Sequence, residues 1–505
     1  MINMSNEKFK SISPADFFYK NREIAGFDNP VKATYMIIRE LVENSLDACE
    51  THKIIPEIFI HLRKIPKSLN VYEIHVQDNG CGIPFDYIPP AFGQILYSSK
   101  YTLRQTRGTF GMGGKMAILY GQITTHFPVT VVSSTGVDDW HLFKLMIDIQ
   151  NNKPIVKSRK SFPNPFHNHG TIIEFRFEGD YIRAKQRIIE YLKLTATILP
   201  YLNLTFIDPD GVLYLFNRST KILPKPPLEM LPHPNGVDME TLNRLISETK
   251  AKSMIEFLQK HFHRVGKRTA MKFLKYANID PSRLPKSLTP DEILYLSQAM
   301  RNYKSFLPPD SQCLSTIGAD LLIKGIRKEF NPEFVAAVTR PPSVYEGHPF
   351  IVEAAIAYGG NISPPQSSGD VNLFRFANKI PLLYDAYNDV SMKVIKKIKW
   401  WRYKMDVEKD PVAFFIHICS TKIPYKTIGK EYIADRPEIE YEIEWALKNC
   451  GKRLRTYLVR KAKMEIKKRR LLVLEKYLPY IAKFASELAG KSNIPNYYEL
   501  LKYMD

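Results

Sequence analysis

The chain has 505 residues, which is too many for one compact core and predicts two to four domains. Its 44% hydrophobic and 25% charged residues are an ordinary globular composition, and no uninterrupted apolar run of about 18 residues occurs, which excludes a membrane-spanning helix. The 72 Lys and Arg against 52 Asp and Glu give a formal charge of +20, which favours an anionic partner, either a nucleic acid or an acidic membrane surface, although a generally basic surface is the alternative.

The cysteines are scattered along the chain, and none is spaced as a metal ligand: Cys49, Cys81, Cys313, Cys419 and Cys450. An odd number of cysteines without a CxxC pair is typical of reduced thiols. The first residues are polar and lack the apolar core of a signal peptide. We therefore expect a soluble intracellular protein.

The first long helix is expected to begin near Pro30, with Asn29 as its N-cap. Four apolar residues fall at helical spacing and are expected to face a core: Met36, Ile37, Leu41 and Ala48. Glu40, Asn44 and Asp47 form a polar stripe about sixty degrees round from the apolar one. This stripe is typical of an ordinary solvated helix face, or of a carboxylate and an amide held half buried beside a core.

Two strands are expected next, at 57–62 and 71–77, and the second ends at the segment Asp78-Asn79-Gly80-Cys81-Gly82. Turn residues explain Asn79 and Gly80, but the second glycine indicates a backbone that a ligand approaches closely. An aspartate at the end of a strand is suited to accept a hydrogen bond from an exocyclic amine. A simple turn is the alternative.

A glycine-rich loop is expected to lead into a helix that starts with the apolar run 116–120. The loop consists of Gly108, Thr109, Phe110, Gly111, Met112, Gly113, Gly114 and Lys115. Free backbone N–H groups at a helix N-terminus suit a polyphosphate, although a mobile surface loop is the alternative. The loop is not a P-loop, because Thr109 stands at the first glycine position and Met116 follows the lysine. Met116 also stands where a dinucleotide-binding fingerprint needs its last glycine.

Further strands are expected at 129–133, 142–149, 170–177 and 204–207, the last of them closing the domain, with a helix at 181–199. Four blocks then stand in a fixed order: 40–48, 78–82, 108–115 and Gly170-Thr171. Together they resemble the ATP-binding fold (the GHKL superfamily) of gyrase-type topoisomerases, the large heat-shock chaperones, histidine kinases and mismatch-repair ATPases. The blocks 40–48, 108–115 and 375–383 are similar to the B subunits of DNA topoisomerase VI, and this resemblance runs over nearly the whole chain.

The resemblance implies roles for the polar residues, with ATP and Mg²⁺ as cofactors. Glu40 would be the general base that polarises the water attacking the γ-phosphate. Asn44 would supply an amide oxygen to Mg²⁺. Asp78 would accept from the adenine amino group, with Thr171 supporting it. The lid over the phosphates would comprise Ser99, Lys100 and the loop 108–115.

The implied fold class is α/β (α+β), in four parts. An ATP-binding domain, a Bergerat-type sandwich with an amino-terminal arm, would span 1–228, and a helix–two-turns–helix insert 229–306. A ribosomal S5-like α/β transducer would span 307–470, and a C-terminal helical extension 471–505. A proline-rich linker is expected at 224–234.

The insert is predicted from three helical patterns. Two apolar stripes are separated by residues 266–269, and a third helix opens at Thr289 with a capping box. Lys267 and Arg268, at the predicted turn, are suited to meet DNA phosphates, although a structural spacer is an equal alternative.

In the transducer, strands are expected at 334–338, 350–358, 373–376 and 412–419, followed by a loop at 423–431. The resemblance implies that this loop sends a lysine to the γ-phosphate. We assign that lysine to Lys430, with Lys426 as the competitor. A helix over about 438–487, interrupted near Cys450-Gly451, is strongly basic between 452 and 470. It is expected to line a channel for duplex DNA, with a solvated charged face as the alternative.

The function implied by the resemblance is that of the ATP-hydrolysing subunit of a type IIB DNA topoisomerase. ATP would join two B subunits through their first domains, with the arms exchanged, and trap one DNA duplex. Lys430 would couple nucleotide state to the tilt of the transducer. A separate A subunit would cleave DNA within an A2B2 heterotetramer, in the cytoplasm and at the nucleoid of an archaeal-type cell, without a membrane.

Three rival functions agree less well with the sequence. A mismatch-repair or chaperone ATPase is disfavoured by the helical insert. A histidine kinase is disfavoured because no membrane segment or phosphoacceptor helix precedes the ATP-binding blocks. A non-hydrolysing scaffold relative is disfavoured by the presence of Glu40, Asn44 and Lys430.

Overall fold

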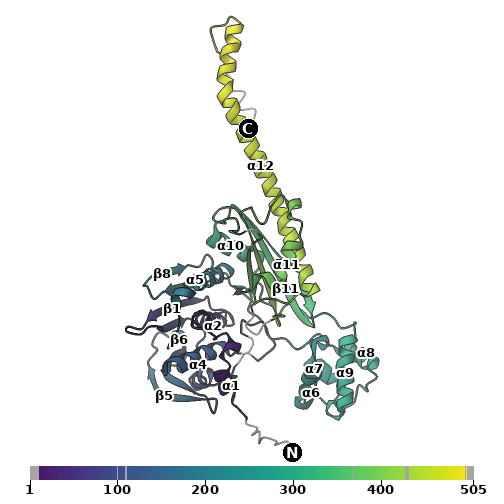
Figure 1. The fold of residues 1–505 in the computed structure, drawn as a ribbon. Helices are drawn as coiled ribbons and strands as arrows, with labels where there is room; N and C mark the ends of the chain where they lie inside the picture. The colour runs from purple at the N-terminus through teal and green to yellow at the C-terminus, as the bar shows by residue number, and fades with distance from the viewer. Residues whose placement is uncertain are drawn as a thin grey trace, which may run out of the picture.

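The computed structural model describes residues 11–98, 101–108, 111–367, 369–426, 431–494 and 496. Figure 1 shows an N-terminal sheet domain, a separate helical domain and a second sheet domain from which one helix extends far beyond the rest of the chain. The mixed α/β fold confirms the predicted fold class. Within the described residues, no helix is both long enough and apolar enough to cross a membrane.

The N-terminal domain is built on one eight-stranded sheet with the order β5-β4-β3-β6-β2-β1-β7-β8. Its strands are β1 (Glu57–Lys64), β2 (Val71–Asp78), β3 (Val129–Thr135), β4 (Trp140–Asp148), β5 (Lys153–Phe162), β6 (His169–Glu178), β7 (Asn203–Ile207) and β8 (Leu213–Phe216). Neighbouring strands are antiparallel except β1 and β7, which are parallel. Two strands were not predicted: β5, a basic edge strand without apolar alternation, and β8, which follows the strand expected to be the last.

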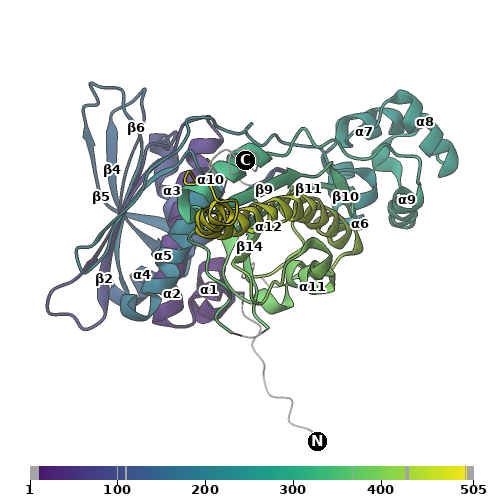
Figure 2. The same ribbon diagram turned by 90° about the horizontal axis from the view of Figure 1, so that it is seen from above.

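Helices cover the face of this sheet that lies toward the second sheet domain (Figure 2). They are α2 (Pro30–Glu50), α4 (Gly113–Thr125) and α5 (Tyr181–Ile198), with the shorter α1 (Pro14–Lys20) and α3 (Ile88–Gly93) and the 3₁₀ turns Arg22–Ala25 and Phe85–Tyr87 at the edges. As predicted, α2 begins at Pro30, and the side chain of Asn29 accepts a hydrogen bond from the backbone N–H of Lys32. Apolar residues of α2 fill the core beneath it, since Ile37 and Leu41 are buried. The prediction for Ala48 was wrong, because Ala48 is only half buried and lines a cavity.

The helical domain has a hydrophobic core of its own, from Val237 to Phe306. It contains α6 (Met239–Glu248), α7 (Met254–His261), α8 (Lys267–Tyr276) and α9 (Pro290–Asn302), with 3₁₀ turns at Pro234–Gly236 and Pro285–Ser287. The capping box at Thr289 is confirmed, since Thr289 and Glu292 bond each other's backbone N–H groups. Helix α6 was not predicted. Lys267 and Arg268 lie in the first turn of α8, after the Gly266 N-cap, and not in the turn before it.

The second sheet domain has six strands in the order β10-β11-β14-β12-β13, with β9 also paired to β11. The strands are β9 (Phe334–Thr339), β10 (Ser343–Tyr345), β11 (His348–Tyr358), β12 (Asn372–Ala377), β13 (Ile380–Leu382) and β14 (Val412–Ser420). The helices are α10 (Ala319–Phe330) and α11 (Val390–Lys397), with 3₁₀ turns at Ala386–Asn388 and Trp400–Tyr403. Helix α10 packs between this sheet and α5, so one hydrophobic core joins the two sheet domains.

Helix α12 (Pro437–Leu488) is 52 residues long and starts against the second sheet before it extends away from the body (Figure 1). The predicted interruption at Cys450-Gly451 was wrong, because the helix runs through it. A Cβ at Gly451 would lie 3.1 Å from the ring of Tyr403, so the glycine allows the helix to approach that ring closely. The glycine is therefore a packing residue within the helix.

Candidate functional site

A cavity of about 640 Å³ lies beside α2, between the end of β2 and the start of α4. Six residues predicted from the sequence to bind the nucleotide line it: Asn44, Asp78, Gly111, Gly114, Lys115 and Thr171. They come from α2, β2, β6 and the glycine-rich segment, so the fold brings together blocks that are up to 127 residues apart in the chain (171 minus 44). A cavity of this size and mixed lining is typical of a small-molecule site.

Asp78 lines the cavity, and three hydrogen bonds orient its carboxylate. Its Oδ1 accepts from the backbone N–H groups of Gly80 at 2.9 Å and Thr171 at 3.2 Å, and its Oδ2 accepts from the Ser45 hydroxyl at 2.7 Å. Burial raises the pKa of the Asp78 carboxyl above its ordinary value of 3.8, although these hydrogen bonds lower it in part. An oriented, desolvated carboxylate with lone pairs to spare suits an exocyclic amine.

The hydroxyl of Thr171 is part of a second set of contacts behind Asp78. It lies 3.0 Å from the Ser133 hydroxyl, which donates to the carbonyl of Gly170 at 2.9 Å and accepts from the N–H of Ile83 at 2.9 Å. These bonds join the loop after β2 to strands β3 and β6. The site around Asp78 is therefore part of the sheet and not of a mobile turn.

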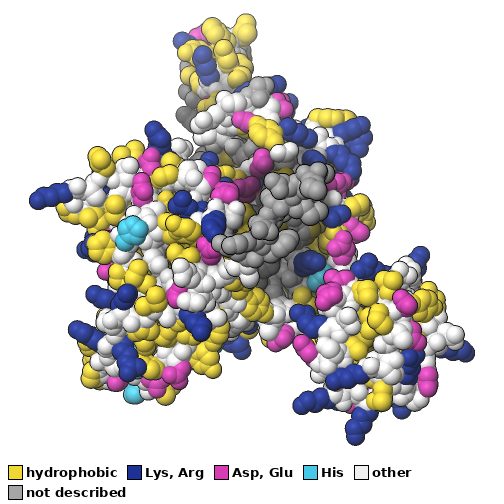
Figure 3. Space-filling view, turned by 60° about the horizontal axis from the view of Figure 1, so that its bottom comes forward, with side chains coloured by type: hydrophobic (Ala, Val, Ile, Leu, Met, Phe, Trp, Pro, Cys, Tyr) yellow, Lys and Arg dark blue, Asp and Glu magenta, His cyan; other side chains and the backbone are white. Residues whose placement is uncertain are grey.

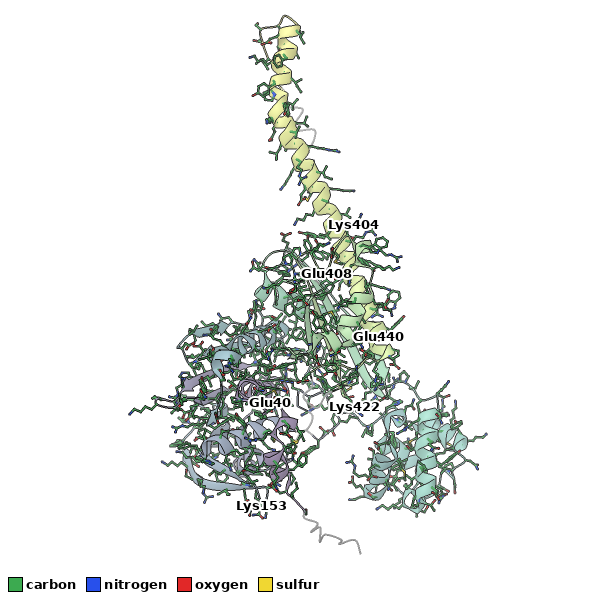
Figure 4. The ribbon with its side chains drawn as sticks, in the orientation of Figure 1. Glu40, Lys153, Lys404, Glu408, Lys422 and Glu440 are labelled. Atoms are coloured by element: carbon green, nitrogen blue, oxygen red, sulfur yellow. The ribbon has the colours of Figure 1, made fainter. Side chains whose placement is uncertain are left out.

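The glycines at the start of α4 lie directly on the polar stripe of α2. A Cβ on Gly113 would lie 1.5 Å from Oε2 of Glu40, and a Cβ on Gly114 would lie 2.6 Å from Nδ2 of Asn44. Glu40, Asn44 and Asp47 are each half buried. Figure 4 shows Glu40 on the side of the N-terminal domain that faces the second sheet domain. The N-terminal end of this 13-residue helix, whose free N–H groups suit an anion, thus adjoins a carboxylate and an amide.

Four other residues of the glycine-rich segment are described: Gly108, Gly111, Met112 and Lys115. Gly111 has φ +58°, a conformation that favours glycine, and a Cβ there would meet the Ser98 hydroxyl at 2.1 Å. Met112 packs against the hydrophobic core. Lys115 is buried and donates to the backbone carbonyl of Tyr97. Gly108 is half buried and does not line the cavity.

Five residues predicted for the site lie outside the described residues: Ser99, Lys100, Thr109, Phe110 and Lys430. Sequence reasoning missed Ser45, which orients Asp78, and Arg107, which forms ion pairs with Asp47 at 3.0 Å and Glu50 at 2.7 Å. Ser45 lies in the same motif as Glu40, directly after Asn44 of the polar stripe. A hydroxyl in that position was a usable signal, whereas the partners of Arg107 could not be found without the fold.

The segment that leads to Lys430 and away from it lies along α2. Tyr425 is close enough to the buried Arg39–Glu43 ion pair for both charges to act on its phenol, whose pKa burial raises. On the far side, Glu431 lies 3.6 Å from Lys32. The two ends of the segment are paired with each other, through Tyr425 with Ile433. The described residues on both sides of this loop therefore lie near α2.

The donor set of the cavity fits a magnesium ion that arrives with a nucleotide. Within the residues that the structure describes, no group of three or more His, Cys, Asp or Glu is placed to hold a metal ion. Asn44 supplies an amide at the cavity, and Mg²⁺ commonly takes one or two protein oxygens, with phosphate oxygens and water completing its shell. The magnesium assignment therefore rests on Asn44 alone.

Comparison with known proteins identifies both sheet domains. Residues 30–177 match the family "Histidine kinase-, DNA gyrase B-, and HSP90-like ATPase", and residues 309–470 match "Topoisomerase VI B subunit, transducer". The second match ends inside α12. The N-terminal domain is thus an ATP-binding domain of the predicted superfamily, and the second sheet domain is a transducer.

Curated relatives extend the match over almost the whole chain. The B subunit of type 2 DNA topoisomerase 6 from Metallosphaera sedula is 46% identical over 484 residues, covering 95% of this chain and 91% of the relative. The protein of the same name from Sulfurisphaera tokodaii is 44% identical over 483 residues, covering 95% and 90%. A crystal structure of the N-terminal domain of a DNA repair protein covers 86% of this chain and 99% of its own, at 14% identity and a TM-score of 0.41, which is too distant to bear on function. The chain therefore belongs to the family of type 2 DNA topoisomerase VI B subunits, the ATPase subunits of type IIB topoisomerases.

Proposed function

We propose that this ATPase subunit uses Glu40 as the general base for ATP hydrolysis and that ATP-driven dimerisation gates the passage of one DNA duplex through another. The observation that carries the proposal is the cavity beside α2. Asp78, Asn44 and Gly114 line it, and Gly113 and Gly114 at the start of α4 adjoin Glu40 and Asn44. An adenine base and a triphosphate need an acceptor for the amino group and a glycine-lined helix start beside one cavity.

At the adenine end, Asp78 accepts a hydrogen bond from the amino group of the base. The proposal is supported by the three donors that already fix its carboxylate, one of them the backbone N–H of Thr171. Because these donors hold the side chain in one orientation, little conformational entropy is lost when the base binds.

At the phosphate end, backbone N–H groups of the glycine-rich segment and Lys115 bind the phosphates. Gly113 and Gly114 allow this backbone to approach Glu40 and Asn44, which a side chain would prevent. Lys115 exchanges its carbonyl partner, Tyr97, for a phosphate oxygen when the lid closes. The rest of the proposed lid comprises Ser99, Lys100, Gly108, Thr109, Phe110, Gly111 and Met112.

In the hydrolysis step, Glu40 accepts a proton from the attacking water as the water's oxygen bonds to the γ-phosphorus and the bond to the β–γ bridging oxygen breaks. Half burial reduces the number of water molecules that compete for the carboxylate. Asn44 holds the magnesium ion, which when bound neutralises charge on the phosphate oxygens.

Lys430 reaches the γ-phosphate and reports its presence to the transducer. The anchoring of residues 425 and 431 on α2 supports a lysine from this loop. Lys426 is the weaker candidate, because it is paired with Asp435 at 3.2 Å and lies over the ring of Tyr432. A lysine already bound to an acidic partner on the transducer must give up that pair before it can reach a phosphate.

The protein works with a separate A subunit that cleaves DNA, in an A2B2 heterotetramer. The names of the relatives, which are B subunits, support this partner. So does the end of α12, which extends from the body (Figure 1) and exposes a row of large apolar side chains that the partner would cover. They are Leu472, Val473, Tyr477, Tyr480, Ile481, Phe484 and Leu488.

Two copies of the chain associate through their N-terminal domains when ATP binds, with exchange of the amino-terminal arms. Exposed side chains of Ile12, Phe17 and Tyr19 support a partner for this part of the chain.

The four parts proposed for the chain are 1–228, 229–306, 307–470 and 471–505, and the separate core of the helical domain supports the second. A cytoplasmic, nucleoid-associated location fits a protein that acts on DNA.

Duplex DNA is bound through the charge of its phosphates and not through recognition of its base sequence. Exposed Lys and Arg side chains on α12, among them Lys463, Lys467 and Arg470, support a DNA-facing helix, whereas Arg453 and Lys461 bind the transducer itself. The support for DNA contacts by Lys267 and Arg268 is weaker. On the face that Figure 3 shows, basic side chains of the helical domain alternate with acidic and hydrophobic ones.

The test is the Glu40→Gln variant, measured for ATP hydrolysis and for ATP binding. We expect hydrolysis to fall about a hundredfold or more, while binding of a non-hydrolysable ATP analogue changes less than about threefold. Glu438→Gln, an exposed glutamate on α12, is the control and should behave as the wild type. Hydrolysis at an unchanged rate in Glu40→Gln would refute the catalytic assignment.

A further inference from the structure

The stem of the lid, residues 103–107, lies between the two lid segments in the sequence and is bonded to distant parts of the chain. Gln105 makes two hydrogen bonds to the backbone of Ser315, at 2.7 and 3.1 Å. The carbonyl of Thr106 accepts from the side-chain amide of Asn378 at 3.2 Å. Both partners lie in the transducer, so the stem of an ATP-domain loop is held by the neighbouring domain.

Buried charges strengthen this attachment. The carboxylate of Glu50, at the end of α2, accepts from Arg107 at 2.7 Å, from the Tyr201 hydroxyl at 2.7 Å and from Lys379 of the transducer at 3.0 Å. Arg107 also binds Asp47, so two carboxylates face two cations. Because the group is buried, removal of one charge leaves the others poorly compensated. Burial alone would raise the pKa of Glu50, but Arg107 and Lys379 lower it to about 2, so the carboxylate is ionised.

On the transducer side, Lys379 belongs to a fixed part of the sheet. Asn378 and Lys379 form the turn between β12 and β13, with φ values of +47° and +66°. The backbone N–H of Lys379 donates to His417 on β14 at 3.0 Å, and His417 lies 2.9 Å from the buried Glu353. Glu353 in turn accepts from the backbone N–H of Gly318 at the start of α10. Lys379 is therefore joined through hydrogen bonds to the helix that packs on α5.

We propose that Lys379 and Gln105 are positioning residues that tie closure of the lid over ATP to the position of the transducer, as a coupling route separate from Lys430. Neither side chain lines the cavity proposed for the nucleotide. Lys379 acts through Glu50 and Arg107, which immediately precedes Gly108, and Gln105 acts through Ser315. This inference rests on the proposed function of the same cavity, and it adds that movement of the lid stem must move the transducer or break these bonds.

The experiment compares Lys379→Met and Gln105→Leu with Arg375→Met in the full-length chain assembled with its A subunit. Arg375 is the matched control. It is a buried cation four residues from Lys379, but its partners are Asp389 at 3.1 Å and the carbonyls of Leu382 and Tyr384, all within the transducer. The measured quantities are the release rate of a fluorescent, non-hydrolysable ATP analogue and the number of ATP molecules hydrolysed per strand-passage event. Melting temperatures establish that each variant is folded.

For both Lys379→Met and Gln105→Leu, we expect analogue release to become about tenfold faster and ATP use per event to rise about tenfold, a change within the range of coupling energies between contacting residues. Initial analogue binding should remain within about threefold. Arg375→Met should lower the melting temperature but leave the analogue release rate and the ATP use per event unchanged. Unchanged release and unchanged ATP use in the two stem variants would overturn the inference, and so would an equal change in Arg375→Met. If the wild type fails to hydrolyse ATP, or Glu40→Gln hydrolyses it normally, the proposed function fails instead.

Discussion

The carboxylate of Glu40 lies against the backbone of Gly113, so closely that a Cβ on that residue would be 1.5 Å from Oε2. Glu40 is on α2 and Gly113 is the first residue of α4, so the contact fixes the distance between the proposed base and the proposed phosphate-binding helix end. It also explains in physical terms why a glycine is required at this point of the loop. Any side chain would displace the carboxylate or the helix.

Gly113→Ala is therefore expected to reduce ATP hydrolysis about a hundredfold, because a displacement of about 1 Å at a reacting group has that effect. Steady-state hydrolysis measures it, with far-UV circular dichroism as the check on folding. Gly266→Ala, where an added Cβ meets nothing within 4 Å and φ is negative, is the control and should retain wild-type activity. Normal hydrolysis by Gly113→Ala would show that the observed contact is not part of the working geometry.

Single substitutions distinguish the roles of the two lysines of the transducer loop, Lys426 and Lys430. Lys430→Ala is expected to reduce kcat for ATP hydrolysis about a hundredfold or more, because it removes a cation from the developing charge on the γ-phosphate. Lys426→Ala should leave kcat within about threefold, since Lys426 is paired with Asp435 on the transducer. The reverse result in the same hydrolysis assay would assign the role to Lys426.

Acidification should weaken ATP binding earlier than an ordinary aspartate would allow. Burial raises the pKa of Asp78 above 3.8, and only the ionised carboxylate offers both oxygens as acceptors, so affinity falls as the pH drops through that raised value. Titration of a fluorescent ATP analogue at a series of acidic pH values measures this fall in affinity. The Asp78→Asn variant is expected to bind the analogue about ten- to a hundredfold more weakly and to show no such fall with pH. An affinity that stays constant down to pH 3.8 would contradict the assignment.

Glu50 has a lowered pKa, in contrast to the raised pKa of Asp78, and its ionised carboxylate stabilises the fold. Its pKa is lowered from 4.5 to about 2 in the folded chain, so its contribution is fully present above pH 4.5 and is lost as the pH falls toward 2. The melting temperature of Glu50→Gln should therefore lie below that of the wild type at neutral pH, and the gap should close between pH 4.5 and 2. A gap that does not change with pH would refute the ion-pair account.

Elements with strong periodicity or clear end signals could be predicted from the sequence. Asn29 and Pro30 marked the start of α2, and Thr289 with Glu292 marked that of α9. Strand β5 lacked a signal because, as an edge strand, it exposes most of both faces and so shows no apolar alternation. Gly451 was misinterpreted for a different reason, since a glycine that serves close packing against Tyr403 has the same letter as one that ends a helix.

The candidate site also has features that the sequence could predict and features that it could not. The ordered motifs, through the family resemblance that they carry, were enough to predict that Asn44, Asp78 and Thr171 share one cavity. The partnership of Glu50 with Lys379 could not be predicted, because it joins residues 329 positions apart and depends on how two domains pack. Sequence patterns are local, whereas buried charge pairs between domains are set by the fold.

The most direct test of the central claim is relaxation of supercoiled DNA by the purified chain, with and without an A subunit and ATP. The account predicts relaxation only when the chain, the A subunit and ATP are all present, and loss of repeated relaxation in Glu40→Gln. Relaxation by the chain alone, or equal relaxation without ATP, would contradict it.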